Sequence, residues 1–509
     1  WQIRDDLTFD LIYGNEIVDS QSEFIDAYGQ DFNYAGWDHL KNASVYSSSS
    51  TSSHSRTVGN FGSLSLAYKN MLFFNATGRY DIVSTMPRGS RSFFYPSVSL
   101  GWIFTELDVV KNDILTYGKL RASYAEVGQA GTYYPSYYST PTYGGGFSSG
   151  TPIQYPIGTI VAYTPYSLVY DPNLKPQNTI SYELGLDLAF LNGLVNLNYT
   201  YSRQNVKDQI FDVPLAGSTG SGSLRTNGGS IHTNTHELSL GVAPVKNKNF
   251  KWDFAFNFTK IENTVDELAP GVESIFLGGF TEPQVRAGIG YKFPVIYGVG
   301  YLRNEQGQIV VDANGLPQAG EEKVIGTVSP KFTLGFNTNF EIYKVRISAL
   351  FDWKNGGQMY GGTFNMLNYY GVSQKSADFR KADHFYFEED AVKVTGTDGN
   401  GNPTYAKNDI AISGANAQAY FSQMSNISES MIVDASYIKL RKISISYPVW
   451  NKNGITVDVS AFGRNILLWS AYEGFDPEAS QGNTNMSGAF ERFSLPSTSS
   501  YGLGVNIKF

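Results

Sequence analysis

Between Ile180 and Tyr201 the sequence alternates apolar and polar residues on both sides of an Asn192-Gly193 dipeptide. A period of two residues indicates a β-strand with two unlike faces, and Asn-Gly tolerates the positive φ angles of a tight hairpin turn. The segment is therefore predicted to form an antiparallel hairpin. Its apolar face consists of Tyr182, Leu184, Leu186, Leu188, Phe190, Val195, Leu197, Tyr199 and Tyr201, and its other face of Glu183, Gly185, Asp187, Ala189, Asn196, Asn198, Thr200 and Ser202.

Both β-sandwiches and membrane β-barrels contain alternating hairpins, but the two classes differ in strand length and in the polar face. Sandwich strands are usually about five or six residues long, with an outer face that is often charged. Here about ten residues alternate, which is the length of a tilted strand that crosses a bilayer, and the polar face is mostly Asn, Thr, Ser and Gly. No run of about 20 apolar residues exists that would span a bilayer as a helix. The sequence therefore favours a membrane barrel.

The connections between the expected strands alternate between short and long, apart from a modest loop at Ser84 to Ser92. Short turns on one rim and long loops on the other are typical of outer-membrane barrels, whose long loops lie outside the cell. The predicted fold class is therefore all-β, a transmembrane antiparallel β-barrel with long extracellular loops. The short set is Lys69-Asn70, Leu107 to Thr116, Asn192-Gly193, Lys246 to Asn249, Tyr343-Lys344 and Asn451 to Gly454, and the long set is Gln129 to Asn178, Gln209 to Ile231, Asp266 to Pro330, Gly356 to Val433 and Leu468 to Ser500.

Residues 1–509 are expected to form one barrel domain with about 15 strands of an expected total of about 22. Single-chain bacterial barrels normally have an even number of strands, so we expect further strands before Trp1. The stretch before Thr57 is the least regular part of the chain. It is expected to contain one strand, Leu7 to Tyr13, an acidic loop from Asn15 to Asp38, and a serine-rich tract from Ser47 to Ser53.

Composition and motifs argue against an enzyme and against a nucleic-acid partner. The chain has no cysteine, which excludes disulfides, thiolate metal sites and a cysteine nucleophile, and its net charge of -8 does not favour nucleic acid. His-Glu-x-x-His and phosphate-loop motifs are absent from the sequence, and no nucleophile, base and orienting group form a recognisable set. Glu183 and Asp187 share a face and could pass for a catalytic pair, but the polarity of a barrel lumen explains them more simply.

A tyrosine-rich loop is the candidate for ligand contact. Tyrosine offers a flat apolar ring with a polar tip, which suits the stacking of sugar rings or the clasping of a peptide. The alternative is that these rings pack the loop onto itself or onto a partner protein. The candidate substrate-binding residues are Tyr133, Tyr134, Tyr137, Tyr138, Tyr143, Tyr163 and Tyr166, with Phe147 and Tyr155 in the same loop.

Two patterns bear on metal binding, and no metal ligand is assigned from either. His232 and His236 would lie on one side of a strand, but no third ligand is evident, so polar residues of the lumen are the simpler interpretation. Asp398 to Asn402, with Asp409 twelfth, resembles a calcium loop, although Pro403 stands where that loop needs glycine. A solvated turn is the simpler interpretation of this segment too. Asp312 to Gly315 resembles a calcium loop less closely. No cofactor is expected, and calcium at the Asp398 loop is the alternative to the solvated turn.

Several segments, in order along Thr57 to Phe509, resemble signature segments of the SusC-like TonB-dependent transporters of Bacteroidetes outer membranes. The match departs from the family after Arg79 and Asp81, where Ile82-Val83-Ser84 replaces the usual Gly-Ser-Ser turn. The family's amino-terminal plug, TonB box and first barrel strands also have no counterpart here. The matching segments are Tyr95 to Trp102 (YPSVSLGW), Lys119 to Tyr124 (KLRASY), Asp171 to Asp187 (DPNLKPQNTISYELGLD), Asp434 to Ile443 (DASYIKLRKI), Gly463 to Trp469 (GRNILLW) and Gly474 to Glu478 (GFDPE).

This resemblance implies a multi-pass protein of the cell outer membrane that imports oligosaccharides or peptides. A SusD-like surface lipoprotein would cover the barrel, and TonB would act through the plug. Membrane lipid and the glycan or peptide substrate would be the remaining partners. Two rivals stay open: a structural or interaction barrel of another envelope complex, such as a secretion machine, and a secreted β-rich enzyme or adhesin. The sequence does not identify the substrate, because the loops carry that specificity.

Overall fold

The computed structural model describes residues 2–110, 112–135, 138–139, 143–146, 152–388, 390–452, 454–482 and 488–509. The chain divides into two units. Unit 1 comprises Trp1–Trp102, Ala122–Tyr182 and Asn205–Ser230, and unit 2 comprises Ile103–Arg121, Glu183–Gln204 and Ile231–Phe509. Among the helices of the described residues, none is both long and apolar enough to cross a membrane.

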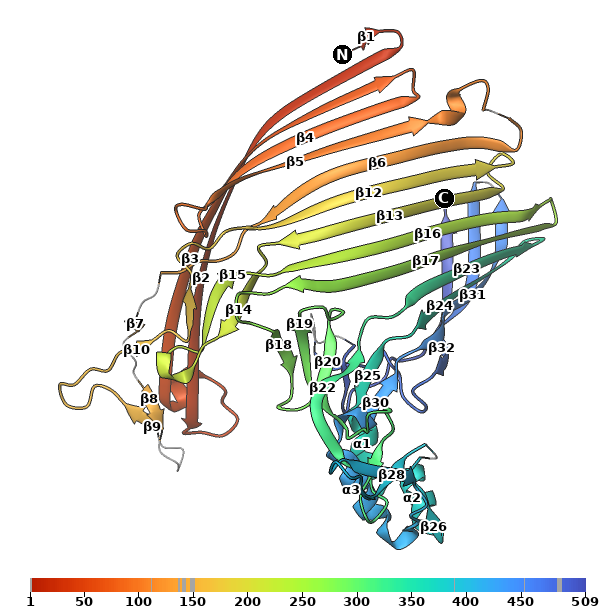
Figure 1. Ribbon diagram of the computed structural model, residues 1–509. Helices are drawn as coiled ribbons and strands as arrows, with labels where there is room; N and C mark the ends of the chain where they lie inside the picture. The colour runs from red at the N-terminus through yellow and green to blue at the C-terminus, as the bar shows by residue number, and fades with distance from the viewer. Residues whose placement is uncertain are drawn as a thin grey trace. The chain divides into compact units, whose positions relative to one another are not determined.

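A 15-stranded sheet contains every strand of the described residues that is longer than β34 (Ser500–Lys508), which has nine residues (Figure 1). The strands follow one another in the sheet in the order in which they occur along the chain, so the sheet is an up-and-down meander. This confirms the predicted all-β class and the expectation of about 15 strands, although the short β1 was not foreseen. The strands are β1 (Gln2–Arg4), β2 (Leu7–Phe32), β3 (Ala43–Tyr68), β4 (Leu72–Val83), β5 (Ser92–Ile103), β6 (Leu115–Gln129), β12 (Gln177–Phe190), β13 (Val195–Lys207), β16 (Ser230–Lys246), β17 (Phe250–Glu267), β23 (Phe332–Ile342), β24 (Val345–Asn355), β31 (Tyr437–Lys452), β32 (Ile455–Ser470) and β34 (Ser500–Lys508).

The connections between the strands of this sheet are partly folded, and they contain further short strands and helices. The short strands are β7 (Tyr138–Ser139), β8 (Tyr143–Gly146), β9 (Pro152–Gln154), β10 (Thr164–Pro165), β11 (Leu168–Tyr170), β14 (Ile210–Pro214), β15 (Ser223–Asn227), β18 (Ser274–Gly279), β19 (Gln284–Gly288), β20 (Val295–Tyr301), β21 (Val310–Val311), β22 (Ala319–Thr327), β25 (Gln358–Gly361), β26 (His384–Phe385), β27 (Val392–Thr397), β28 (Pro403–Lys407), β29 (Ile412–Ser413), β30 (Ile432–Asp434) and β33 (Phe490–Glu491). The helices are α1 (Gly362–Tyr369), α2 (Gln374–Lys381) and α3 (Ala417–Ser425), with the 3-10 turns η1 (Leu40–Asn42), η2 (Phe104–Glu106), η3 (Gly217–Thr219), η4 (Gly414–Asn416) and η5 (Ser428–Met431).

The short connections form tight turns where the sequence predicts them. Between β12 and β13 the residues Leu191, Asn192 and Gly193 all have positive φ angles. A hydrogen bond of 3.1 Å from Gly193 N–H to the Phe190 carbonyl closes this turn. The turn therefore spans residues 191–194 instead of two residues, but it reverses the chain as expected.

The stretch before Thr57 differs from its prediction. Its acidic residues do not form a loop, because β2 and β3 pair in register from Leu7↔Tyr68 to Phe32↔Ala43. β4 accompanies β3 only over Thr57–Tyr68, so residues 43–56 of β3 continue past the last residue of β4. The acidic segment and the serine tract are the two strands of one long ribbon. Their mixture of polar and apolar residues lacks the alternation by which a strand is recognised.

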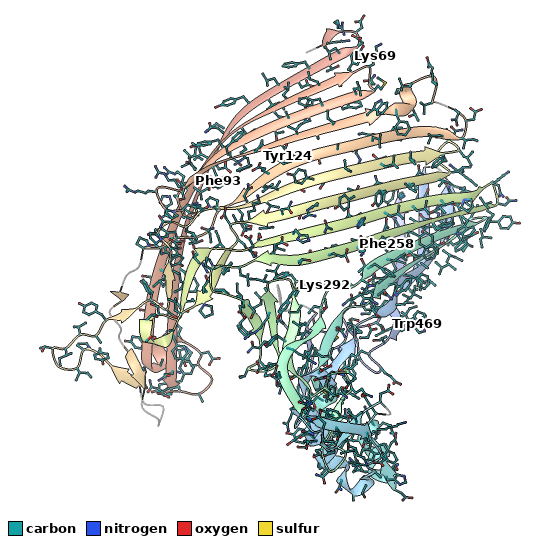
Figure 2. The ribbon with its side chains drawn as sticks, viewed as in Figure 1. Lys69, Phe93, Tyr124, Phe258, Lys292 and Trp469 are labelled. Atoms are coloured by element: carbon teal, nitrogen blue, oxygen red, sulfur yellow. The ribbon has the colours of Figure 1, made fainter. Side chains whose placement is uncertain are left out.

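The two faces of the long sheet differ in chemistry within unit 2. On one face of β17, β23 and β24 the rings of Phe256 and Phe336 stack at 4.6 Å, and Phe336 contacts Phe351 at 6.1 Å. On the other face Asn339 donates to Asp253 at 2.8 Å. Figure 2 shows side chains standing off both sides of these strands, Phe258 among them. Alternation has sorted aromatic and polar residues onto opposite faces, as the sequence predicts.

The long loops of unit 2 have hydrophobic cores of their own. One core contains Tyr301 of β20, Phe387, and Tyr420 and Phe421 of α3, with Ile427 completely buried. A second gathers Val285, Ile296, Ile325, Val328, Ala489 and Phe490. Because segments from three different connections contribute to these cores, the loops are fixed relative to one another by apolar burial.

Candidate functional site

The tyrosine-rich loop brings part of its predicted set around Tyr170 of β11. The rings of Tyr133 and Tyr134 meet the Tyr170 ring edge-on, with centroids 6.1 and 5.7 Å away. Tyr134 remains exposed. Tyr163 and Tyr166 are exposed farther along the loop. Tyr137 lies outside the described residues, and the backbone of Tyr138 and Tyr143 belongs to β7 and β8, with their side chains outside the described set.

A polar cleft of about 300 Å³ lies in the same unit. Arg225 of β15 and Asp212 of β14 are register partners. The Arg225 guanidinium donates two hydrogen bonds, of 2.7 and 2.9 Å, to the Asp212 carboxylate. The Arg225 guanidinium also lies 5.4 Å from the centre of the Tyr170 ring, so the cleft adjoins the tyrosine cluster. The cleft is lined by Gln129, Ala130, Gly131, Thr132, Gln177, Ile210, Phe211, Asp212 and Arg225.

The cleft offers donors and acceptors with little net charge. Gln177 donates to Gln129 at 2.7 Å, which leaves further amide donor and acceptor capacity on both side chains. The hydrogen bond to Asp212 raises the pKa of Arg225 above its ordinary value, so the guanidinium stays charged beside the Asp212 carboxyl group. A ligand with hydroxyl or amide groups beside an apolar ring fits such a lining.

One asparagine holds the loop segment that begins with the signature Asp171-Pro-Asn-Leu-Lys. The Asn227 side chain accepts from Lys175 N–H at 2.6 Å and donates to the carbonyls of Lys175 and Asp208 at 2.7 and 2.8 Å. Thr226 donates to Asp171 at 2.9 Å. This part of the signature therefore serves to fix the loop beside β15, and with it the position of Tyr170.

Sequence reasoning found the tyrosines but missed Tyr170, Asp212, Arg225 and the two glutamines. Asp212 and Arg225 are 13 residues apart, in strands of five residues each. Strands that short carry too few residues for alternation to be visible. The opposite charges of Asp212 and Arg225 across the Gly- and Ser-rich segment 216–223 are the one signal that could have suggested their pairing.

A buried ion cluster in unit 2 joins β31 to the long loop after β32. The Lys439 ammonium lies 2.7 Å from Asp476 and also donates to Glu478. The side chains of Lys439 and Asp476 are only 2% and 3% exposed. Arg441, on the same face of β31, binds Glu478 at 2.6 Å and Asp352 of β24 at 3.0 Å. Two cations therefore hold three carboxylates.

The cluster keeps its loop carboxylates ionised. Burial by itself would raise the pKa of Asp476, but hydrogen bonds from Lys439 and Ser497 outweigh it and lower the pKa to about 2. Burial would also raise the pKa of Glu478, but hydrogen bonds from Arg441 and Lys439 outweigh this effect and lower the pKa to about 2. The signature segments around Tyr437–Arg441 and Gly474–Glu478, separate in the sequence, thus meet as one anchor for the loop.

The polar face of the central hairpin is also bonded across strands. Arg121 of β6 binds Asp187 through bonds of 2.9 and 3.1 Å, and Asn198 donates to the same carboxylate. A Cβ on Gly185 would come within 2.6 Å of the Arg121 guanidinium, which explains the glycine at this position. Pairing with Arg121 therefore explains the charged Asp187 side chain, and no catalytic role is needed to explain it.

The two histidines do not share a metal-like site. His232 is bonded to Asp266 at 2.7 Å, whereas His236 is bonded to the Tyr199 hydroxyl at 2.8 Å and its ring lies 5.1 Å from that of Tyr201. Because Tyr199 and Tyr201 belong to the apolar face of the hairpin, His236 lies on that face. The expectation that the histidines belong to the polar face is therefore wrong for His236, and His232, four residues earlier in β16, is on the same side by strand alternation.

The two aspartate turns are closed by their own backbone. Asp398 accepts from the N–H groups of Asn400 and Asn402, both at 2.8 Å, and Asp409 is paired with Lys393. Asp312 accepts from Asn314 N–H at 2.8 Å. Within the part of the chain that the structure describes, no group of three or more His, Asp or Glu side chains is placed to hold a metal ion. The solvated turn stays the prediction for Asp398 to Asn402, with calcium as the alternative that the sequence offers.

Comparison with known proteins places these features in context. The family described as "TonB dependent receptor-like, beta-barrel" matches residues 1–418. TonB-dependent receptor P3 of Formosa agariphila is 24% identical, covering 98% of this chain and 50% of its own length. TonB-dependent receptor SusC of Bacteroides thetaiotaomicron is 24% identical, covering 93% of this chain and 46% of its own length.

Among solved structures, that of the RagAB peptide transporter matches all of this chain and 54% of its own, with a TM-score of 0.75 at 17% identity. A match at this identity shows a common fold. The chain spans about half the length of the curated relatives named above.

Proposed function

Because the chain belongs to the TonB dependent receptor-like β-barrel family, whose description matches residues 1–418, we propose that it forms the barrel part of an active importer in the outer membrane. The two-faced long sheet supports the membrane part of this proposal. Its apolar face suits lipid and its bonded polar face suits an aqueous lumen. Family membership also argues against an enzyme.

The proposed cargo is an oligosaccharide or a peptide. The observation that carries this is the tyrosine cluster around Tyr170 beside the cleft that Arg225 and Asp212 line. Aromatic rings next to paired donors and acceptors suit both ligand classes. One relative of similar fold is described as a peptide transporter, and that description applies to the relative.

The proposed partners are a SusD-like surface lipoprotein and TonB. The lipoprotein would close over the loops and retain the ligand, and TonB would act through a plug domain of the whole protein. The loop core of unit 2 that contains the buried side chains of Tyr301 and Phe421 supports this proposal, because a folded loop offers such a partner a fixed surface.

The proposal is tested with the full-length protein, its lipoprotein and its own membrane. Tyr134→Ala and Arg225→Gln are each expected to weaken binding of the imported oligosaccharide or peptide up to about tenfold, because each removes a contact worth about 0.5–1.5 kcal/mol. Tyr343→Ala changes another exposed tyrosine, 69% exposed against 55% for Tyr134 and on a short turn, and is the matched control. Growth of a deletion strain on single glycans and on peptides identifies the cargo. Unchanged growth on every one of them would contradict import.

A further inference from the structure

An apolar groove of about 840 Å³ runs along β32 in unit 2. Its walls and floor come from neighbouring strands of the long sheet. Its principal side chains are Ile443, Ile445, Ala461, Gly463, Tyr501 and Leu503.

Strand register explains why the groove exists. Gly463 is the partner of Ile443 on one side and of Tyr501 on the other, and Ala461 is flanked in the same way by Ile445 and Leu503. Two small residues in the middle strand thus lie between two rows of large ones. Strands are spaced by about 4.8 Å, so the rows stand roughly 10 Å apart, which leaves the width of about one hydrocarbon chain.

Larger residues close the groove at both ends. A Cβ on Gly463 would lie 3.1 Å from the Ile466 side chain, so Ile466 already covers the end of the groove at Gly463. At the other end Val459 faces Tyr447 and Val505, and its side chain fills the middle row. The groove is therefore a bounded depression and differs from the rest of the apolar face.

The groove lies on the apolar face of the sheet, and the hydrogen bonds between polar side chains lie on the opposite face. On the opposite face Ser348 and Ser444 are hydrogen-bonded at 2.7 Å. The groove side exposes Ile445, Tyr501 and Leu503, the last by 85%. If the chain is an outer-membrane barrel, as proposed above, this face meets lipid, and the groove is continuous with the lipid-facing surface.

Position along the strand selects the leaflet. Gly463 is eight residues beyond Ile455, where the short turn ends, which corresponds to about 20 Å of height for a tilted strand. The long loop follows at the other end of β32. The groove is thus in the half of the membrane nearer the long loops, and the Tyr501 hydroxyl suits the boundary with head groups.

We propose that this groove is a specific site for one saturated acyl chain of lipopolysaccharide, the lipid of the outer leaflet. The chain lies along Ala461 and Gly463, between the isoleucines of β31 and the side chains of Tyr501 and Leu503. The site binds hydrocarbon by shape and burial, since no charged side chain belongs to its principal lining.

The test uses the full-length protein, extracted from outer membranes with a mild detergent, and counts the lipopolysaccharide retained on each barrel by native mass spectrometry. Ala461→Leu fills the middle row and is expected to remove about one lipopolysaccharide per barrel. Ala349→Leu is the matched control, because Ala349 is the partner of Ile443 in β24 and lies outside the principal lining. The control is expected to retain the wild-type number.

Leu503→Ser removes a wall without adding volume, and it is expected to lower retention even if Ala461→Leu assembles poorly. Equal retention in wild type, Ala461→Leu and Leu503→Ser overturns the proposal, as does equal loss in the Ala349→Leu control. Retention of phospholipid instead of lipopolysaccharide overturns it too. Fractionation beforehand shows whether the protein is in the outer membrane, so that failure of the proposed location is distinguished from failure of the lipid site.

Discussion

Lys439 and Asp476 are 37 residues apart in the sequence, yet the ammonium of one lies 2.7 Å from the carboxylate of the other. Both side chains are almost completely buried. A buried ion pair gives little net stability by itself, because desolvation offsets the attraction. Its consequence is geometric. If Asp476 moved away, the buried Lys439 ammonium would lose one of its two carboxylate partners, so the pair keeps the loop after β32 attached to β31.

Lys439→Met is expected to release this loop. Removing one partner of a buried pair leaves the other charge uncompensated and costs about 3–5 kcal/mol. Asp476 would keep only Ser497 of its side-chain donors. Limited proteolysis of the full-length protein in detergent is expected to cut within residues 471–499 in the variant before it cuts the wild type.

Two further variants show whether the pair itself is responsible. Lys442→Met changes an exposed lysine of the same strand and is expected to leave the cleavage rate unchanged. Lys439→Met combined with Asp476→Leu removes both charges and is expected to recover much of the protection. A double variant as sensitive as Lys439→Met alone would refute the ion-pair explanation.

The anchor is also expected to weaken in acid. Asp476 and Glu478 have pKa values near 2 in the fold, against 3.8 and 4.5 ordinarily. A lowered folded pKa contributes stability that is complete above the unfolded pKa and is lost as the pH falls toward the folded one. The protection factors of residues 471–482, which compare the observed hydrogen-exchange rate with the intrinsic rate at each pH, are therefore expected to fall between about pH 4.5 and pH 2 and to be constant from pH 5 to 8. A transition near neutral pH would contradict these assignments.

The two faces of the central hairpin are expected to respond differently to the same charge. Leu186→Arg places a cation on the apolar face and is expected to cost about 2–4 kcal/mol near the midplane. Asn198→Arg places it beside Asp187 on the bonded polar face, where the cost is expected to be far less. Urea unfolding of barrels reconstituted in lipid measures both. Equal penalties would show that the faces are wrongly assigned.

Strand positions were predictable wherever one face of a strand is apolar and the other polar. Phe254 and Phe256 alternate with Asp253 and Asn257, and the pattern specifies both the strand and its faces. The segment Ser47–Ser53 has no such contrast, since nearly every residue is a serine, and a strand with two polar faces is indistinguishable from a loop by its pattern. Pairing with β2 makes it a strand, and that pairing is a long-range fact.

The candidate cleft was only partly predictable for a different reason. Tyrosine density marked the loop that holds Tyr133 and Tyr134. Arg225 lies in a sheet of three short strands and Gln177 begins the long strand β12, so their meeting depends on how these elements are arranged in space, and local sequence does not encode that arrangement. The ion cluster was also only partly predictable. Its segments were visible as family signatures, but the sequence did not show that Arg441 binds Glu478.

The ribbon of β2 and β3 is expected to depend on a single asparagine at its tip. The ribbon's serine-rich strand specifies its register weakly, because no apolar face distinguishes one alignment from the next. Asn42 is 1% exposed, and its amide donates to the carbonyls of Tyr34 and Trp37 at 2.7 and 2.8 Å while it accepts from Tyr34 N–H at 3.0 Å. These bonds close residues 33–42 into a fixed turn, and the turn fixes which residues of the two strands face each other.

Asn42→Ala would leave two carbonyls and one N–H group without their partner, at a cost of about 1–3 kcal/mol each where they stay buried. Hydrogen exchange is expected to accelerate over residues 33–42 and to extend into residues 20–32 and 43–56, where β4 gives no support. Residues 57–68, paired with β4, are expected to keep their protection. Ser50→Ala, an exposed change within the ribbon, is the control and should alter nothing. Acceleration confined to the turn itself would show that the strands hold their register without the asparagine.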